Sequence, residues 1–171
     1  MDILKKNFFE LFNIDVAVDI NKLELDKKVK VLQSQFHPDK YASGSDFEKR
    51  LALQISSHVN DGYKVLSDIV LRIDYILKIN NFIKDESKTI NDIEFLQEQI
   101  EYSELVENLK DNLNNEIIDK HLLEIKLLLK TTIDNIKLSF KSQDFEDVWQ
   151  NLSKIRFYIK NINELITMRQ K

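Results

Sequence analysis

A short run of residues with distinctive chemistry, His37-Pro38-Asp39-Lys40, lies between two stretches with helical periodicity. Pro38 is the only proline in the chain. Proline lacks a backbone donor and disfavours the α-helical conformation in the residue before it. We therefore expect the preceding helix to stop there and the four residues to be displayed on a short, stiff turn. Such a turn contributes little to a core, but it presents a contact point to another molecule.

The imidazole of His37 and the carboxylate of Asp39 allow three interpretations. They can form a hydrogen-bonded pair at a helix end, a docking point, or a general acid–base pair. The sequence nearby supplies no nucleophile or oxyanion-binding group, which argues against catalysis. Cysteine is absent, and neither His58 nor His121 adds metal-ligand spacing. The sequence therefore predicts no metal site and no cofactor.

The composition predicts an all-α protein. The chain has 171 residues, of which 43% are hydrophobic and 32% charged, with only two glycines and one proline. This leaves enough apolar side chains for a core but few turn or strand signals. The length fits one or two domains.

Charge and hydropathy exclude several classes of function. A net charge of −4 argues against nucleic-acid binding, which needs a basic surface. The sequence has no apolar run long enough for a membrane span and no secretory signal pattern, so we expect a cytoplasmic protein. Residues 85–107 contain eight acids and one base. That run is either a solvated helix face or a surface for a basic partner.

The first half of the sequence predicts an antiparallel helical hairpin flanked by shorter helices. Short helices are expected at about 7–12 and 67–79, and long ones at about 21–36 and 45–66, the last with a Ser45–Glu48 capping box. The apolar stripes of the two long helices are Leu25, Val29, Leu32 and Phe36, and Phe47, Leu51, Ile55, Val59, Gly62 and Leu66. Gly62 would allow another helix to approach closely.

The second half predicts a three-helix bundle. Periodicity is lost at about residue 80 and returns in three longer helices, at about 92–113, 116–141 and 145–168. The expected organisation is therefore a first domain over 1–80, a linker over 81–91 and a bundle over 92–171.

The helix at 21–36 has a basic side. At 100° per residue, Lys27 and Lys30 point away from the apolar stripe and Lys28 lies on its flank. This basic face leads to the His37–Lys40 turn, so the two together predict a docking surface for an acidic partner.

The helix at 92–113 has apolar residues on two opposite faces, although a bundle helix needs only one. One stripe is Phe95, Tyr102, Leu105, Val106, Leu109 and Leu113, and the other is Ile93, Leu96 and Ile100, bordered by Gln97, Glu101 and Glu104. The shorter stripe with its acidic rim predicts an interaction surface. In the last helix, Phe157 lies off the predicted core stripe, either as a binding anchor or as an ordinary surface residue.

The His37-Pro38-Asp39 tripeptide between a lysine-bearing helix and a second long helix resembles a J domain. Longer stretches are similar to the HscB-type iron–sulfur co-chaperones within the J-domain family. These stretches are Gln35 to Ser45, Asn60 with Tyr63 and Leu66, Arg72 to Leu77, and Phe95 to Glu101. The resemblance covers the whole chain and is thinnest through 116–144.

This resemblance implies that residues 1–80 form a J domain that stimulates ATP hydrolysis by a DnaK/HscA-type chaperone. It implies that His37, Pro38 and Asp39 contact the chaperone where its ATPase domain meets its interdomain linker. The surrounding positive contacts would come from Lys27, Lys28, Lys30 and Lys40. The chain itself would not be an enzyme, because hydrolysis would occur in the chaperone's own site.

The resemblance also implies that the C-terminal bundle binds an IscU-type scaffold and delivers it to the chaperone during iron–sulfur cluster assembly. The matching positions are Leu96, Ile100, Glu101, Glu104 and Phe157. Gln97 is polar where the relatives carry an apolar residue, so the contact there would be weaker or shifted. Two alternatives are a J-domain co-chaperone for an unrelated client and a non-catalytic helical adaptor.

Overall fold

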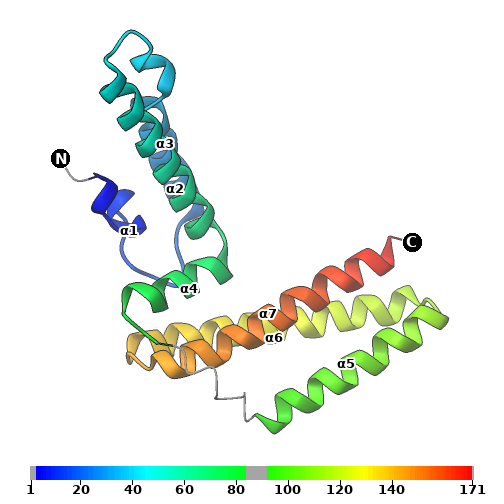
Figure 1. Cartoon of the computed structure of the whole chain (residues 1–171). Helices are drawn as coiled ribbons and strands as arrows, with labels where there is room; N and C mark the ends of the chain where they lie inside the picture. Colours follow the sequence, from blue (N-terminus) through cyan, green and yellow to red (C-terminus); the bar gives the residue numbers. More distant parts are fainter. Residues whose placement is uncertain (1–2, 84–91, 171) are drawn as a thin grey trace. The chain divides into compact units, whose positions relative to one another are not determined.

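The computed structural model describes residues 3–83 and 92–170, and all regular elements within these ranges are helical, which confirms the all-α prediction (Figure 1). The chain divides into two compact units, Met1–Phe82 and Ile83–Lys171. Most of the linker expected at 81–91 lies outside the described residues. Asn81 and Phe82 still belong to the first unit, because their amides close the end of its last helix on the carbonyls of Lys78 and Leu77.

The first unit is built around a helical hairpin. Its long helices are α2 (Lys22–Gln35) and α3 (Asp46–Ser67), which pack side by side and are joined through the short 3₁₀ helix η2 (Pro38–Tyr41) (Figure 1). The shorter helices α1 (Phe8–Leu11) and α4 (Ile69–Ile79) pack against α3. A further 3₁₀ turn, η1 (Ile3–Lys5), precedes α1. The predicted hairpin and its flanking helices are thereby confirmed.

Side-chain caps fix where these helices begin. Ser45 and Glu48 form the predicted capping box at the start of α3, with each side chain accepting the other residue's backbone N–H. Asn21 caps α2 and Asp68 caps α4, each by accepting one backbone N–H of the first turn.

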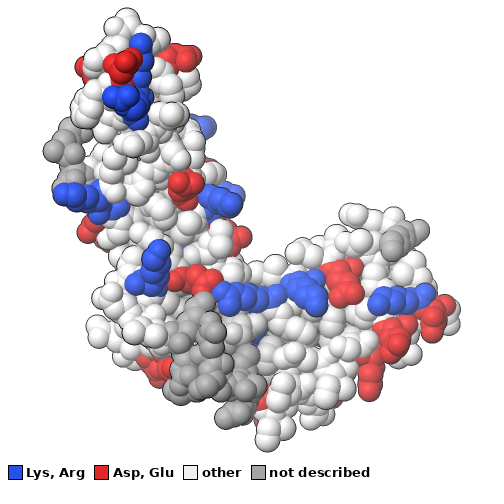
Figure 2. All heavy atoms as spheres, in the orientation of Figure 1, with Lys and Arg blue, Asp and Glu red and all other residues white. Residues whose placement is uncertain are grey.

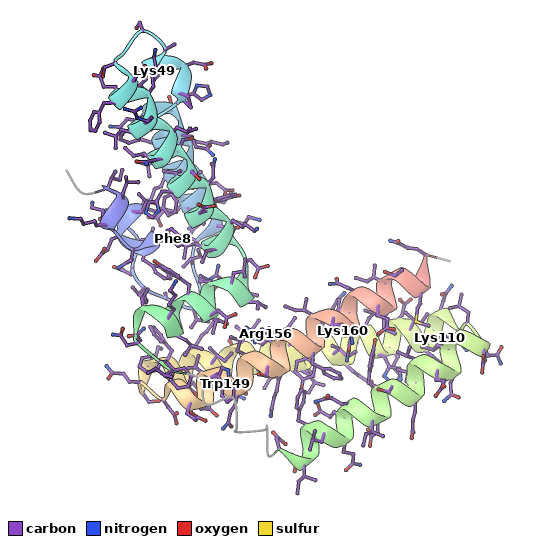
Figure 3. All side chains as sticks on the ribbon, viewed as in Figure 1. Phe8, Lys49, Lys110, Trp149, Arg156 and Lys160 are labelled. Carbon is purple, nitrogen blue, oxygen red and sulfur yellow. The ribbon has the colours of Figure 1, made fainter. Side chains whose placement is uncertain are left out.

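Gly62 lies where α1 crosses α3. A Cβ atom at this position would come within 2.9 Å of Phe8 and 3.0 Å of Phe12. The Phe8 ring stacks on Tyr75 at 4.7 Å and contacts His58 at 5.2 Å, so it links α1 to both α3 and α4 (Figure 3). The predicted close approach at Gly62 is confirmed.

The second unit contains α5 (Ile93–Asp111), α6 (Asn115–Lys141) and α7 (Phe145–Arg169), which confirms the predicted three-helix bundle (Figure 1). The pair α6 and α7 packs along its length, and α5 joins the pair through large side chains. The shared core includes Phe95, Val106, Leu109, Ile118, Leu122, Ile125, Tyr158, Leu165 and Met168. In the described part of the chain, no helix has the length and apolar character needed to cross a bilayer.

Candidate partner-binding surfaces

The His37–Lys40 turn is exposed and anchored from both sides. His37 has the extended conformation expected before a proline, with φ −61° and ψ 128°, and Pro38 begins η2. Phe36, directly before the turn, is buried and ties it to the core of the first unit. The side chains of His37 and Asp39 are 56% and 90% exposed. As predicted, the turn presents its polar side chains to solvent.

The imidazole of His37 is oriented by a local hydrogen bond. Its Nδ1 accepts the backbone N–H of Asp39 at 3.3 Å, so the proton of the neutral ring is on Nε2. The carboxylate of Asp39 lies 3.6 Å from Nδ1, beyond hydrogen-bonding distance. The turn therefore offers a partner one N–H donor and one unshared carboxylate.

The connection after the turn is also held in place. The backbone N–H of Lys40 donates to the carbonyl of His37 at 3.0 Å, and the N–H of Gly44 donates to that of Tyr41 at 3.0 Å. Glu48 accepts from both the backbone and the hydroxyl of Ser45, and these bonds hold the pKa of its carboxyl below the ordinary value. The display surface is therefore ordered before any partner binds.

The four lysines of the predicted docking surface are not equivalent. Lys27, Lys30 and Lys40 are exposed and form no ion pair within the described residues. Lys28 is half-buried, and its ammonium lies 2.6 Å from Glu24 and donates to the carbonyl of Asn13 at 2.6 Å. Lys28 therefore braces α2 against the preceding loop, and its role in binding a partner stays a prediction.

One feature of α2 was missed by the sequence analysis. Asp26 is half-buried, and its carboxylate, facing Tyr63 of α3, raises the pKa of the Tyr63 phenol. This interaction links the two hairpin helices. The only signal in the sequence was the presence of Tyr63 among the residues that carry the family resemblance.

The outer face of α5 carries the second predicted surface, which we call the α5 patch. Ile93, Leu96 and Ile100 are 79%, 44% and 61% exposed. Of the bordering residues, Gln97 donates its side-chain amide to Glu101 at 2.9 Å, and Glu104 is exposed. The prediction of two apolar faces on this helix is confirmed, because Phe95, Val106 and Leu109 on the opposite face are buried.

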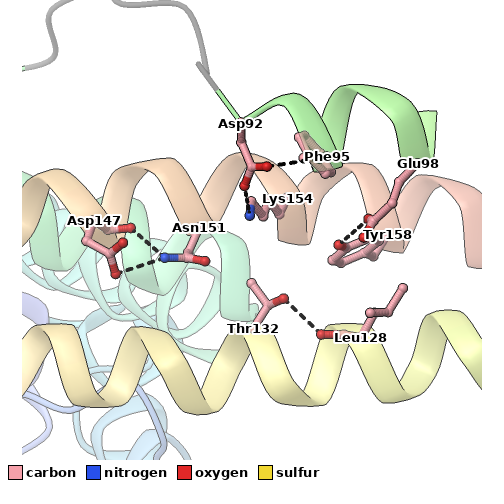
Figure 4. Close-up of polar contacts among 9 residues, drawn as sticks. All are labelled: Asp92, Phe95, Glu98, Leu128, Thr132, Asp147, Asn151, Lys154 and Tyr158. Atoms are coloured by element: carbon pink, nitrogen blue, oxygen red, sulfur yellow. Dashed lines mark hydrogen bonds and ion pairs between the residues drawn. The ribbon is translucent and has the colours of Figure 1, made fainter. Parts of the chain in front are cut away.

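Polar contacts between α5 and α7 fix the orientation of the α5 patch (Figure 4). Asp92 caps α5 and forms an ion pair with Lys154, and the Tyr158 hydroxyl donates to Glu98 at 2.8 Å. The bond from Lys154, followed by that from the backbone of Phe95, lowers the pKa of Asp92. Burial, followed by the bond to Glu98, raises the pKa of Tyr158. In the opposite direction, Tyr102 of α5 donates its hydroxyl to the backbone carbonyl of Asn161 on α7 at 3.1 Å.

Phe157 does not occupy the outer position expected from the sequence. It is half-buried and packs against the core, with its ring 5.4 Å from Phe95 and 5.8 Å from Tyr102, both approached edge-on. The prediction was wrong because α7 contacts helices on two adjacent sides. Its buried face consequently includes Tyr158, Asn161, Leu165 and Met168, and Phe157 lies beside that face. Binding of the scaffold by Phe157 stays a prediction.

Charged groups of both signs are interspersed over the face shown in Figure 2, without one dominant basic or acidic field. Among the described residues, no group of three or more His, Cys, Asp or Glu side chains could hold a metal ion. Both surfaces present exposed hydrogen-bonding groups, charges and apolar side chains.

Comparisons with known proteins identify relatives of this chain. Residues 91–166 match the HSCB C-terminal oligomerisation domain. The chain is 32% identical to the co-chaperone protein HscB homolog of Colwellia psychrerythraea, over 90% of this chain and 91% of the relative. It is 36% identical to the homolog of Neisseria meningitidis, over 92% and 96%.

Two solved structures share the fold. The chaperone HscB from Vibrio cholerae superposes with a TM-score of 0.84 at 23% identity, covering 96% of this chain and 98% of that one. The human co-chaperone protein HscB superposes with a TM-score of 0.79 at 28% identity, covering 96% of this chain and 82% of that one. The identities to the full-length relatives show that this chain belongs to the HscB family of co-chaperones.

Proposed function

We propose that this protein stimulates the ATPase of a DnaK/HscA-type chaperone through its first unit and delivers an IscU-type iron–sulfur scaffold held by its second unit. Delivery of the scaffold takes place in the cytoplasm, where ATP is available to the chaperone. The protein is not an enzyme in this scheme. It binds preferentially the chaperone conformation in which the chaperone's own site hydrolyses ATP faster, and so shifts the population toward that conformation.

The observation that carries the proposal is the pre-ordered His37–Lys40 turn. A free imidazole N–H and an unshared carboxylate stand next to lysines that have no partner within the described residues. A partner can therefore bind here without first breaking contacts or ordering a loop, which lowers the entropic cost of association. The lysines add electrostatic steering toward an acidic chaperone surface.

The α5 patch supports the second half of the proposal. Three exposed apolar side chains in a row on one helix face, with a polar and acidic rim, match the composition of a protein interface. A chain that holds both partners raises their effective concentration for each other. The scaffold can then be transferred to the chaperone while both are bound to the same chain.

The chaperone half is tested by ATP turnover of the chaperone with wild type and with His37→Gln. We expect stimulation by wild type and its loss in the variant. His37 is exposed and forms only a local hydrogen bond, so the variant should keep its fold. Ser43→Ala, at an exposed position in the same connection, is the matched control. Equal stimulation by His37→Gln would favour the helical-adaptor alternative.

The scaffold half is tested by titrating purified IscU-type scaffold against Leu96→Ala/Ile100→Ala. Loss of two interface anchors should weaken binding by about 1–3 kcal/mol. The control is Leu123→Ala/Leu127→Ala, which removes equally apolar side chains that are 73% and 64% exposed on α6. Equal affinity of both variants would favour the alternative of a J-domain co-chaperone for an unrelated client.

A further inference from the structure

A pocket of about 180 Å³ lies between the three helices of the second unit. Its walls come from Glu98, Glu101, Tyr102 and Leu105 of α5, His121, Glu124, Ile125 and Leu128 of α6, and Phe157, Tyr158 and Asn161 of α7. The pocket is smaller than the roughly 300–1,000 Å³ of sites for drug-sized ligands. Its size instead fits one long side chain.

The rim of the pocket is acidic, and two of its three carboxylates are bonded only to neutral groups. Glu98 accepts from the Tyr158 hydroxyl at 2.8 Å, and Glu101 accepts from the Gln97 amide at 2.9 Å. Neither donor cancels a negative charge. The third carboxylate, Glu124, lies 3.1 Å from His121 and 3.9 Å from Lys120, so a new cation there would compete with weak, exposed contacts.

The interior of the pocket is apolar and aromatic. Leu105, Leu128 and Phe157 contribute hydrocarbon surface, and Leu128 is still 39% exposed. Lysine and arginine side chains combine an aliphatic stem, which packs on apolar surface, with a charged head that pairs with carboxylates. They also bind favourably to aromatic faces. An apolar pocket with an acidic rim is complementary to this pair of residue types.

Tyr102 and Leu105 of the pocket lie on the face of α5 opposite the α5 patch, but Glu101 belongs both to the pocket and to the border of the patch, so a protein that covers the patch and extends past Glu101 reaches the pocket. We propose that the partner docked on the α5 patch inserts a basic side chain, lysine or arginine, into this pocket. The identification of that partner as the iron–sulfur scaffold rests on the proposed function. The pocket would then select for a scaffold face that carries a cation beside its apolar contact area.

The pocket itself is tested on the full-length protein by NMR titration with ethylguanidinium chloride. We expect saturable shifts of the side-chain signals of Leu105, Ile125, Leu128 and Phe157. Ethylurea, a neutral molecule of the same shape, and sodium chloride at equal ionic strength should not produce them. Glu124→Gln should weaken the binding at least threefold, whereas Glu107→Gln, an exposed position on α5 outside the pocket, should not. Absence of saturable shifts in wild type would overturn the proposal.

Scaffold titration tests the identity of the occupant. We expect Glu124→Gln to weaken scaffold binding three- to tenfold and Glu107→Gln to leave it unchanged. Equal scaffold affinity for both variants, with ethylguanidinium binding intact, would overturn the insertion of a scaffold side chain. A scaffold that fails to bind wild type while ethylguanidinium still fills the pocket would refute the proposed function and leave the pocket as a site for a basic group.

Discussion

The Tyr158 hydroxyl is one of the groups that hold α5 against α7, and Tyr158→Phe tests this role. The side chain is 4% exposed and donates to Glu98 across the α5–α7 interface at 2.8 Å. Phenylalanine keeps the ring, which packs 6.1 Å from Phe95 and 6.0 Å from Phe157. The substitution therefore removes the hydrogen bond and little of the apolar packing.

The expected loss of stabilising free energy depends on the negative charge of the acceptor, the Glu98 carboxylate. Hydrogen bonds to ionised groups contribute about 1.5–3 kcal/mol. Glu98 is only half-buried and can be solvated once the hydroxyl is gone, so we expect the lower end, about 1.5 kcal/mol. Because α5 joins the other helices mainly through such side chains, the loss should appear as local opening of α5 rather than as unfolding of the whole unit.

Hydrogen exchange followed amide by amide measures this opening. The amides of Val106 and Leu109 in α5 should exchange about tenfold faster in Tyr158→Phe, and that of Ile136 in the α6–α7 pair should change less. Tyr41→Phe is the control, because its hydroxyl bond to the carbonyl of Gln35 is exposed and long at 3.4 Å. Equal acceleration in α5 and α6, or none in either, would refute the view that this bond holds α5.

Three further predictions concern the tyrosines of the second unit, Gly62 and the lysines of α2. Burial raises the pKa of both Tyr102 and Tyr158 above the ordinary 10.0, so with rising pH the two hydroxyls lose their protons in the unfolded chain before they do in the folded chain. The stability that they contribute is therefore complete below pH 10 and should fall as the pH rises further. Urea unfolding should show a smaller fall in the free energy of unfolding for the double Phe variant. Gly62→Ala should destabilise the first unit by about 1 kcal/mol. Overpacking against Phe8 and Phe12 should cost about 2 kcal/mol, and the gain in helix propensity of about 1 kcal/mol offsets only part of it. An unchanged melting temperature would contradict the close approach. Lys27→Gln/Lys30→Gln should slow chaperone association at low salt, with a difference that shrinks at high salt, whereas Lys126→Gln/Lys130→Gln, with the same change of charge on α6, should not.

Local signals in the sequence predicted much of this structure. The Ser45–Glu48 spacing located the start of α3, Pro38 located the end of α2, and the i, i+4 stripes assigned the buried faces of the hairpin. Two opposite apolar stripes on one helix also predicted the α5 patch. These features depend on neighbours within one or two helical turns, which a single sequence contains.

Features that depend on partner helices could not be predicted in the same way. Phe47 continues the apolar stripe of α3 but is 68% exposed, because α3 has 22 residues and α2 only 14, so α2 does not extend along all of α3. Phe157 is half-buried because α7 is covered on two sides. The pairing of Lys28 with Glu24 and the Asn13 carbonyl depends on the path of a loop.

The central claim is that one chain holds a chaperone and a scaffold at the same time through two separate surfaces. Its most direct test is chaperone ATP turnover at limiting scaffold, with His37→Gln and Leu96→Ala/Ile100→Ala assayed singly and mixed. Each variant keeps one surface, so the mixture contains both surfaces on different chains. We predict that scaffold and wild type stimulate turnover synergistically and that the mixture does not. Full synergy from the mixture would contradict the claim.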